Sequence, residues 1–204
     1  MLNPKNTYME NLQSAPVTGP VTDQERAYAI DSLNVTKDAL HQSLAGLSDA
    51  QLTYKPTADS WSVAECVEHI ALVEKRILYA IQASMDAPTE PEKRAEIKVS
   101  DVDVIKAVRS RTTRLSAPDH TVPTGHFGDT ATALAAFDAQ RTAAISYVET
   151  VSGDLRTHYF THFVLGQLDA YQAVLLMSAH CERHRKQIEA VKTNPDYPVT
   201  GVSA

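Results

Sequence analysis

Four long stretches in which apolar side chains recur every three or four residues constrain the fold of this chain most strongly. This spacing is typical of an α-helix that buries one face. The stretches run from about Thr22 to Gly46, from Ser62 through at least Ile81, from Thr130 to Val151 and from Asp169 to Lys192. At about 1.5 Å rise per residue, helices of this kind are roughly 30 to 40 Å long. We therefore predict an all-α fold, a four-helix bundle.

Three of these helices begin with the spacing of a capping box, in which two side chains three residues apart cap backbone N–H groups reciprocally. The pairs are Thr22 with Glu25, Ser62 with Glu65, and Asp169 with Gln172. Alanine is frequent within the helical stretches, whereas most prolines lie between them. These local signals predict where the helices start.

The segment from Pro88 to Gly128 separates the second and third helices. It is charged and contains prolines, and it holds one shorter helical pattern, DVIKAVRSRTTRL. Because a connection of this length can return the chain along the bundle, we expect a long crossover between helices two and three. We divide the chain into an irregular leader at 1–21, one bundle domain at 22–198 and a tail at 199–204.

Composition excludes several classes of protein. The net charge of −6 gives no basic surface for a nucleic-acid backbone, and apolar runs stay shorter than the roughly 18 residues that a membrane span requires. The first residues, MLNPKNTYMENLQ, have no charged segment followed by an apolar one, so we predict a cytoplasmic protein that binds neither nucleic acid nor membrane. The two cysteines, Cys66 and Cys181, are too few for a disulfide scaffold.

The informative histidines are His180 and His184, which lie one helical turn apart on the apolar stripe of the last helix. His69 lies near the edge of the stripe of the second helix, from which a third imidazole can join them. Three imidazoles can hold one divalent ion and leave a coordination position open, as catalytic zinc sites do. The alternative is that the pair consists of hydrogen-bonded structural residues, since chance pairs with this spacing are common.

Other polar residues near these histidines fit catalysis less well. Glu182 is about 200° around the helix from His180, so it faces away and the motif is not that of an HExxH peptidase. Arg183 is about 60° from His180 and could orient a substrate anion, although a solvated arginine is the simpler interpretation. His158 and His162 repeat the spacing in a short segment without a long helix to fix them, so we expect them to be outside the site.

Two motifs together carry a family resemblance: W-S-x-x-E-x-x-x-H from Trp61 to His69, and H-x-x-R-H-x-x-Q-I from His180 to Ile188. The chain resembles the DinB/YfiT-like superfamily over about residues 22–198. The resemblance implies a four-helix bundle with a crossover and a divalent metal such as zinc or nickel on His69, His180 and His184. Relatives are described as metal-dependent hydrolases, or as transferases and isomerases that use low-molecular-weight thiols. Phe163 stands where many relatives carry proline.

Three functions follow from these expectations. The first is hydrolysis of an amide-like or ester-like bond in a small molecule, with the metal activating water and Glu65 as a candidate base, although its capping-box position is a sufficient explanation. The second is a thiol transferase in which the metal binds a low-molecular-weight thiol. The third is a noncatalytic stress-response bundle that binds a ligand or a partner.

Further candidates surround the predicted ion. Cys66, Arg183 and Gln187 are candidates for contacts to a ligand or substrate, although we favour a buried, apolar role for the Cys66 thiol. Three imidazoles suit Zn²⁺, Ni²⁺ and Fe²⁺ alike, so the sequence predicts one divalent ion without selecting among these metals. An exposed helix face would also allow a homodimer.

Overall fold

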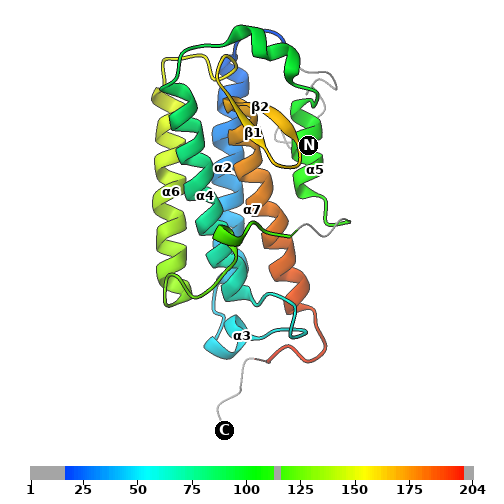
Figure 1. Cartoon of the computed structure of the whole chain (residues 1–204). Helices are drawn as coiled ribbons and strands as arrows, with labels where there is room; N and C mark the ends of the chain where they lie inside the picture. Colours follow the sequence, from blue (N-terminus) through cyan, green and yellow to red (C-terminus); the bar gives the residue numbers. More distant parts are fainter. Residues whose placement is uncertain (1–16, 113–115, 200–204) are drawn as a thin grey trace, which may run out of the picture.

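A computed structural model describes residues 17–112 and 116–199 of the chain. Four long helices form a bundle (Figure 1): α2 (Asp23–Leu44), α4 (Val63–Met85), α6 (Thr130–Thr150) and α7 (Ala170–Lys192). Helices α2 and α4 each pack against both α6 and α7. The predicted four-helix bundle is therefore confirmed, with a small two-stranded sheet added to it.

The order of helix directions differs from a simple up-and-down bundle. In Figure 1, α4 and α6 run in one direction, and α2 and α7 run in the other. The chain must return along the bundle between α4 and α6, and this connection contains η1 (Pro91–Glu96), α5 (Asp101–Arg109) and η2 (Asp119–Thr121). Helix α5 packs against α7 on the way. The predicted crossover is therefore present, and it brings the segment around η2 to α4.

The long helices start where their capping residues lie. Thr22, Ser62 and Asp169 are the N-caps of α2, α4 and α7, and each forms the predicted reciprocal pair with the residue three positions later. The Asp129 side chain caps α6, accepting the backbone N–H of Thr132 at 2.7 Å. Helix α2 ends two residues before Gly46, whose φ of 73° lies in the left-handed region that favours glycine.

Two regular elements were not expected from the sequence. The polar turn after α2 contains the short helix α3 (Asp49–Thr53), which has its own capping box at Ser48. The segment before α7 forms an antiparallel hairpin of β1 (Tyr159–His162) and β2 (Gly166–Asp169), in which Phe160 pairs with Leu168. Each element is too short for a periodic pattern to distinguish it from a turn.

Two arginines are buried within the fold, and each forms ion pairs that join different helices. Arg141 on α6 contacts the Glu74 carboxylate on α4 and donates to the Leu33 carbonyl on α2 at 2.6 Å. Arg156 precedes the hairpin and donates to Glu25 at 2.6 Å, to Asp101 at 2.7 Å and to Asp169 at 3.1 Å. Those three carboxylates lie at the starts of α2, α5 and α7, so Arg156 ties together the amino-terminal ends of three helices.

Of the predicted leader at 1–21, the structure describes only residues 17–21, and of the predicted tail at 199–204 it describes only residue 199. The other residues of both segments lie outside the described part of the chain. Within the ranges 17–112 and 116–199, the helices are too polar or too short to cross a lipid bilayer.

Candidate metal centre

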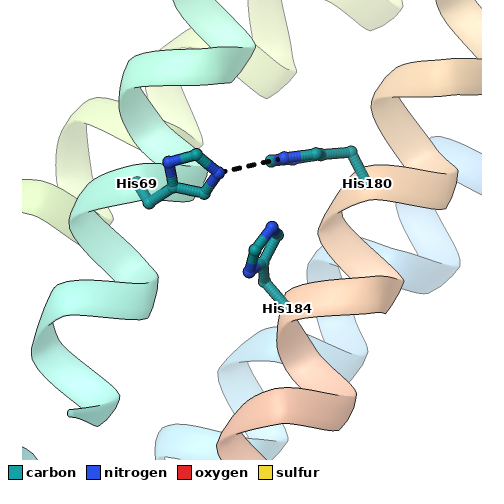
Figure 2. A group of neighbouring side chains, drawn as sticks. All are labelled: His69, His180 and His184. Carbon is teal, nitrogen blue, oxygen red and sulfur yellow. Dashed lines mark hydrogen bonds between the residues drawn. The ribbon is translucent and has the colours of Figure 1, made fainter. Parts of the chain in front are cut away.

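Three histidines converge where α4 and α7 pack together. His69 projects from α4, and His180 and His184 project from successive turns of α7, with all three rings turned toward a common point (Figure 2). Their ligand nitrogens lie within 4.8 Å of one another. The Nε2 atoms of His69 and His180 are 3.2 Å apart. We call these three residues the histidine cluster.

Hydrogen bonds fix which ring nitrogen of His69 and of His184 faces the cluster. His69 Nδ1 donates to the Thr121 carbonyl at 2.7 Å, and because a carbonyl oxygen only accepts, Nδ1 must carry the ring proton. His184 Nδ1 donates to Oε1 of Gln187, one turn further along α7, at 3.0 Å. The Nε2 atom of each of these two rings is left with its lone pair available for a ligand.

Burial keeps the cluster neutral. Desolvation lowers the pKa of His180 and of His184 well below the usual 6.5, and it also lowers the pKa of His69. The neighbouring His184 further lowers the pKa of His180, and the positive charge of Arg183 acts in the same direction on all three rings. Neutral imidazole is the form that binds a metal ion.

The donor set and its spacing fit a divalent ion. Two nitrogens that share a tetrahedral ion at about 2.05 Å would be about 3.3 Å apart, close to the 3.2 Å between Nε2 of His69 and Nε2 of His180. The three donors come from two packed helices, which limits how far they can move apart. Three protein nitrogens also leave a fourth position for water or substrate.

Trp61 forms one wall of the cluster. Its ring centroid is 4.7 Å from that of His69 and 5.8 Å from that of His184, with the latter pair stacked at 30°. Trp61 directly precedes Ser62, the N-cap of α4, so the start of that helix positions the indole. The sequence marked Trp61 as part of the family motif but did not indicate this contact.

Glu65, the candidate base, is engaged at the start of α4. Its Oε2 accepts the Ser62 backbone N–H at 2.7 Å, and its Oε1 lies 3.0 Å from Nζ of Lys55. One carboxylate oxygen therefore has its partner in the cap and the other pairs with a lysine of the preceding loop, which supports the structural role that the sequence already favoured. Its neighbour Cys66 is a free, buried thiol whose pKa is raised by burial to about 12, so it stays protonated at neutral pH.

Of the other polar residues that the sequence analysis considered, one contacts the histidine cluster and three form hydrogen bonds or ion pairs elsewhere. Gln187 contacts His184 directly. Glu182 pairs instead with Arg185 on its own helix at 2.7 Å. His158 Nδ1 lies 2.8 Å from the Ser84 carbonyl, and His162 Nδ1 accepts the N–H groups of its own hairpin turn at 3.1 and 3.2 Å. Neither belongs to the group of ligand nitrogens around His180.

Sequence reasoning missed two residues that support the site without belonging to the histidine cluster. Thr121 holds His69 through its backbone carbonyl, and Glu68 binds the loop that follows Thr121. A backbone carbonyl leaves no signal in the sequence. A glutamate directly before a candidate ligand was the only signal for Glu68, and it is indistinguishable from a surface charge without the fold.

Comparisons with known proteins identify the family and the fold of the chain. Residues 32–188 match the DinB superfamily. The uncharacterised Bacillus subtilis protein YuaE is 26% identical over 149 residues, which cover 73% of this chain and 88% of YuaE. A solved structure with a similar fold is that of YfiT from Bacillus subtilis, which is described as a probable metal-dependent hydrolase with an unusual four-helix bundle topology. The two structures align with a TM-score of 0.58 at 15% sequence identity, and the alignment covers 87% of this chain and 91% of YfiT. The resemblance inferred from the two histidine motifs is thus confirmed, and the chain belongs to the DinB superfamily.

Proposed function

We propose that this chain is a metal-dependent hydrolase that cleaves an amide-like or ester-like bond in a small molecule. The observation that carries the proposal is the convergence of three neutral imidazoles, two of which are held with Nε2 facing the cluster. The description of the structurally similar YfiT as a probable metal-dependent hydrolase supports the same class of reaction. We propose zinc or nickel as the ion, with iron as a third candidate, because imidazole nitrogens suit each of them.

Each residue of the site has a defined task in this proposal. Nε2 of His69, His180 and His184 would hold the ion, while Thr121 and Gln187 keep the protons of His69 and His184 on the outer nitrogens. A divalent ion held there would supply Lewis acidity, which lowers the pKa of a water molecule toward about 7 and polarises a carbonyl group. Trp61 packs against the rings of His69 and His184.

Arg183 would assist by placing positive charge beside the reacting group. Arg183 directly precedes His184 on α7, and its positive charge adds to the effect of burial in lowering the pKa of the three imidazoles. A substrate carbonyl gains negative charge as it is attacked, and a nearby cation stabilises that charge. We therefore propose that Arg183 favours either that charge or an anionic group of the substrate.

Elemental analysis of the purified protein tests the metal. The wild type should hold close to one equivalent of zinc or nickel, and His184→Ala should hold far less. His41→Ala is the matched control, because His41 pairs with Asp138 on the surface between α2 and α6. A wild type that takes up no divalent ion, even after incubation with zinc or nickel, would contradict the proposal.

A panel of ester and amide substrates, tested with and without small thiols, then separates the reactions. Turnover that needs the metal but no thiol supports hydrolysis. Turnover only in the presence of a thiol would replace hydrolysis with the thiol-transferase alternative, in which the ion binds a thiolate. A metal-loaded protein without turnover on any substrate of the panel would favour a noncatalytic, ligand-binding bundle.

A further inference from the structure

The carboxylate of Glu68 binds three consecutive backbone N–H groups of the crossover loop. Oε1 accepts from Thr124 and from His126 at 2.9 Å each, and Oε2 accepts from Gly125 at 3.0 Å. The Glu68 side chain belongs to α4 and is buried. Such hydrogen bonds to an ionised carboxylate are stronger than those between neutral groups.

The loop has the backbone conformation that this contact requires. Gly125 has a φ of 80°, in the left-handed region that favours glycine, and its carbonyl accepts the Gly128 N–H at 3.1 Å. Successive N–H groups that point into one concavity form an anion-binding nest. Here the anion comes from the protein itself, because the Glu68 carboxylate fills the nest.

The same loop holds His69 a few residues earlier. Thr121, whose carbonyl accepts the His69 Nδ1 proton, is itself anchored by donating its backbone N–H and its hydroxyl to the Pro118 carbonyl at 2.8 and 2.9 Å. Glu68 and His69 are adjacent on α4, so this helix forms hydrogen bonds with the loop at two points, the Thr121 carbonyl and the N–H groups of 124–126. The nest at 124–126 therefore restrains the position of the Thr121 carbonyl.

We propose that Glu68 is a positioning residue of the metal centre, which acts through the loop at 121–126 to keep Nε2 of His69 directed at the histidine cluster. The inference rests on the proposed metal-binding function. Glu68 does not act as a ligand or as a base in this role, because its two oxygens are used by the three N–H groups of the loop. It determines how well a histidine ligand is oriented before an ion arrives.

Glu68→Gln tests the role with little change in side-chain size. An amide group can present only one oxygen to the three N–H donors, and its NH₂ group would face a donor instead of accepting from it. We expect the dissociation constant for zinc, measured by competition with a chromophoric chelator, to rise about ten-fold. Glu182→Gln is the control, because it removes a carboxylate between His180 and His184 that pairs with Arg185; its zinc affinity should stay within two-fold of wild type.

Two readouts on the metal-free protein separate positioning from general stability. Hydrogen exchange of the amides of 124–126 should accelerate in Glu68→Gln, while exchange in the core of α7 stays as in wild type. Nitrogen-15 NMR of the imidazoles should show His69 as a single tautomer with the proton on Nδ1 in wild type, and as a mixture of tautomers in Glu68→Gln.

Gly125→Ala provides an independent variant that leaves α4 unchanged. A Cβ at this position has no atom within 4 Å, so its effect is confined to the strained backbone conformation of the nest. It should shift zinc affinity and the His69 tautomer in the same direction as Glu68→Gln, and it replaces that variant if Glu68→Gln does not fold.

The outcomes distinguish this inference from the proposed function. Unchanged zinc affinity and an unchanged His69 tautomer in both variants would overturn the role of Glu68 while leaving the metal centre intact. A wild type that binds no metal would overturn the proposed function, and with it the role of Glu68 in metal binding. The tautomer and exchange measurements would then still show whether Glu68 orients His69.

Discussion

The Nε2 atoms of His69 and His180 face each other at 3.2 Å across the packed helices α4 and α7. Because Thr121 holds the His69 proton on Nδ1, the His69 Nε2 can only accept a hydrogen bond. A neutral His180 must therefore donate from its own Nε2 when no ion is bound. The contact between the two rings thus depends on a proton at the position where an ion would bind.

This relationship predicts a tautomer change at one ligand. On addition of Zn²⁺, the ring proton of His180 should move from Nε2 to Nδ1, whereas His69 keeps its proton on Nδ1. Nitrogen-15 NMR of the imidazoles before and after titration measures both changes. Because all three rings are already neutral, zinc binding at pH 7.5 should release no protons from the rings and at most about one from the water that the ion activates, which calorimetry in buffers of different ionisation enthalpy can check. Release of about one proton per ring would contradict the neutral cluster.

A second prediction concerns Gln187. Its Oε1 accepts the Nδ1 proton of His184 at 3.0 Å, so removing the amide should leave that ring free to rotate or to change tautomer. We expect Gln187→Ala to weaken zinc binding by about ten-fold with little loss of stability, as measured by chelator competition and thermal unfolding. Gln187→Glu keeps an acceptor and should retain tighter binding than the alanine variant. Equal affinities for alanine, glutamate and wild type would exclude the orienting role.

The sequence predicted those parts of the fold that depend on local signals. The starts of α2, α4 and α7 follow from capping pairs three residues apart, and their buried faces follow from helical spacing. The hairpin before α7 could not be predicted in this way, because its strands of four residues are stabilised by pairing across the turn and by packing on the bundle.

The candidate site shows the same division between local and long-range information. His180 and His184 are paired by helical spacing alone, whereas the position of His69 near the stripe of its helix only allowed it to join them, and the family motif was needed to single it out. The Thr121 carbonyl lies 52 positions from His69, and the loop amides lie 56 to 58 positions from Glu68. Which loop residue meets which helix is determined by the path of the crossover, and that path has no periodic signature in the sequence.

A third prediction concerns the ion pair in the centre of the bundle. Arg141 and Glu74 are buried, and Arg141 also donates to the Leu33 carbonyl and to the Thr36 hydroxyl at 2.6 and 2.7 Å. Arg141→Met should reduce the free energy of unfolding by about 3–5 kcal/mol, because it leaves a carboxylate buried without its partner. Urea denaturation measures the loss.

The double variant provides the control for that pair. Adding Glu74→Leu to Arg141→Met removes the unpaired carboxylate, so the double variant should be more stable than Arg141→Met alone. If the double variant is instead less stable than the single variant by the full cost of Glu74→Leu, the two side chains do not interact energetically. Zinc content should be unchanged in any variant that folds, since neither residue contacts the histidine cluster.

The last prediction is a pH dependence of stability in the metal-free protein. Burial lowers the pKa of His69, His180 and His184 below the usual 6.5, so the unfolded chain binds protons at a higher pH than the folded chain does. The stabilisation that depends on neutral rings is therefore fully present above pH 6.5 and is lost as the pH falls below it. Each ring can contribute a slope of up to about 1.4 kcal/mol per pH unit.

Chemical denaturation between pH 7.5 and 5.5, with a chelator present, measures this slope. The double variant His180→Leu/His184→Leu should show a flatter profile, because the two rings whose pKa is lowered most are absent. His162, whose pKa burial also lowers, remains in both proteins and contributes equally. If the free energy of unfolding falls with pH equally in the double variant and in the wild type, protonation of His180 and His184 does not destabilise the fold, and the prediction is wrong. In the presence of zinc, the wild-type curve should lie higher and fall more steeply below pH 6.5, since protons then compete with the ion for the same Nε2 atoms.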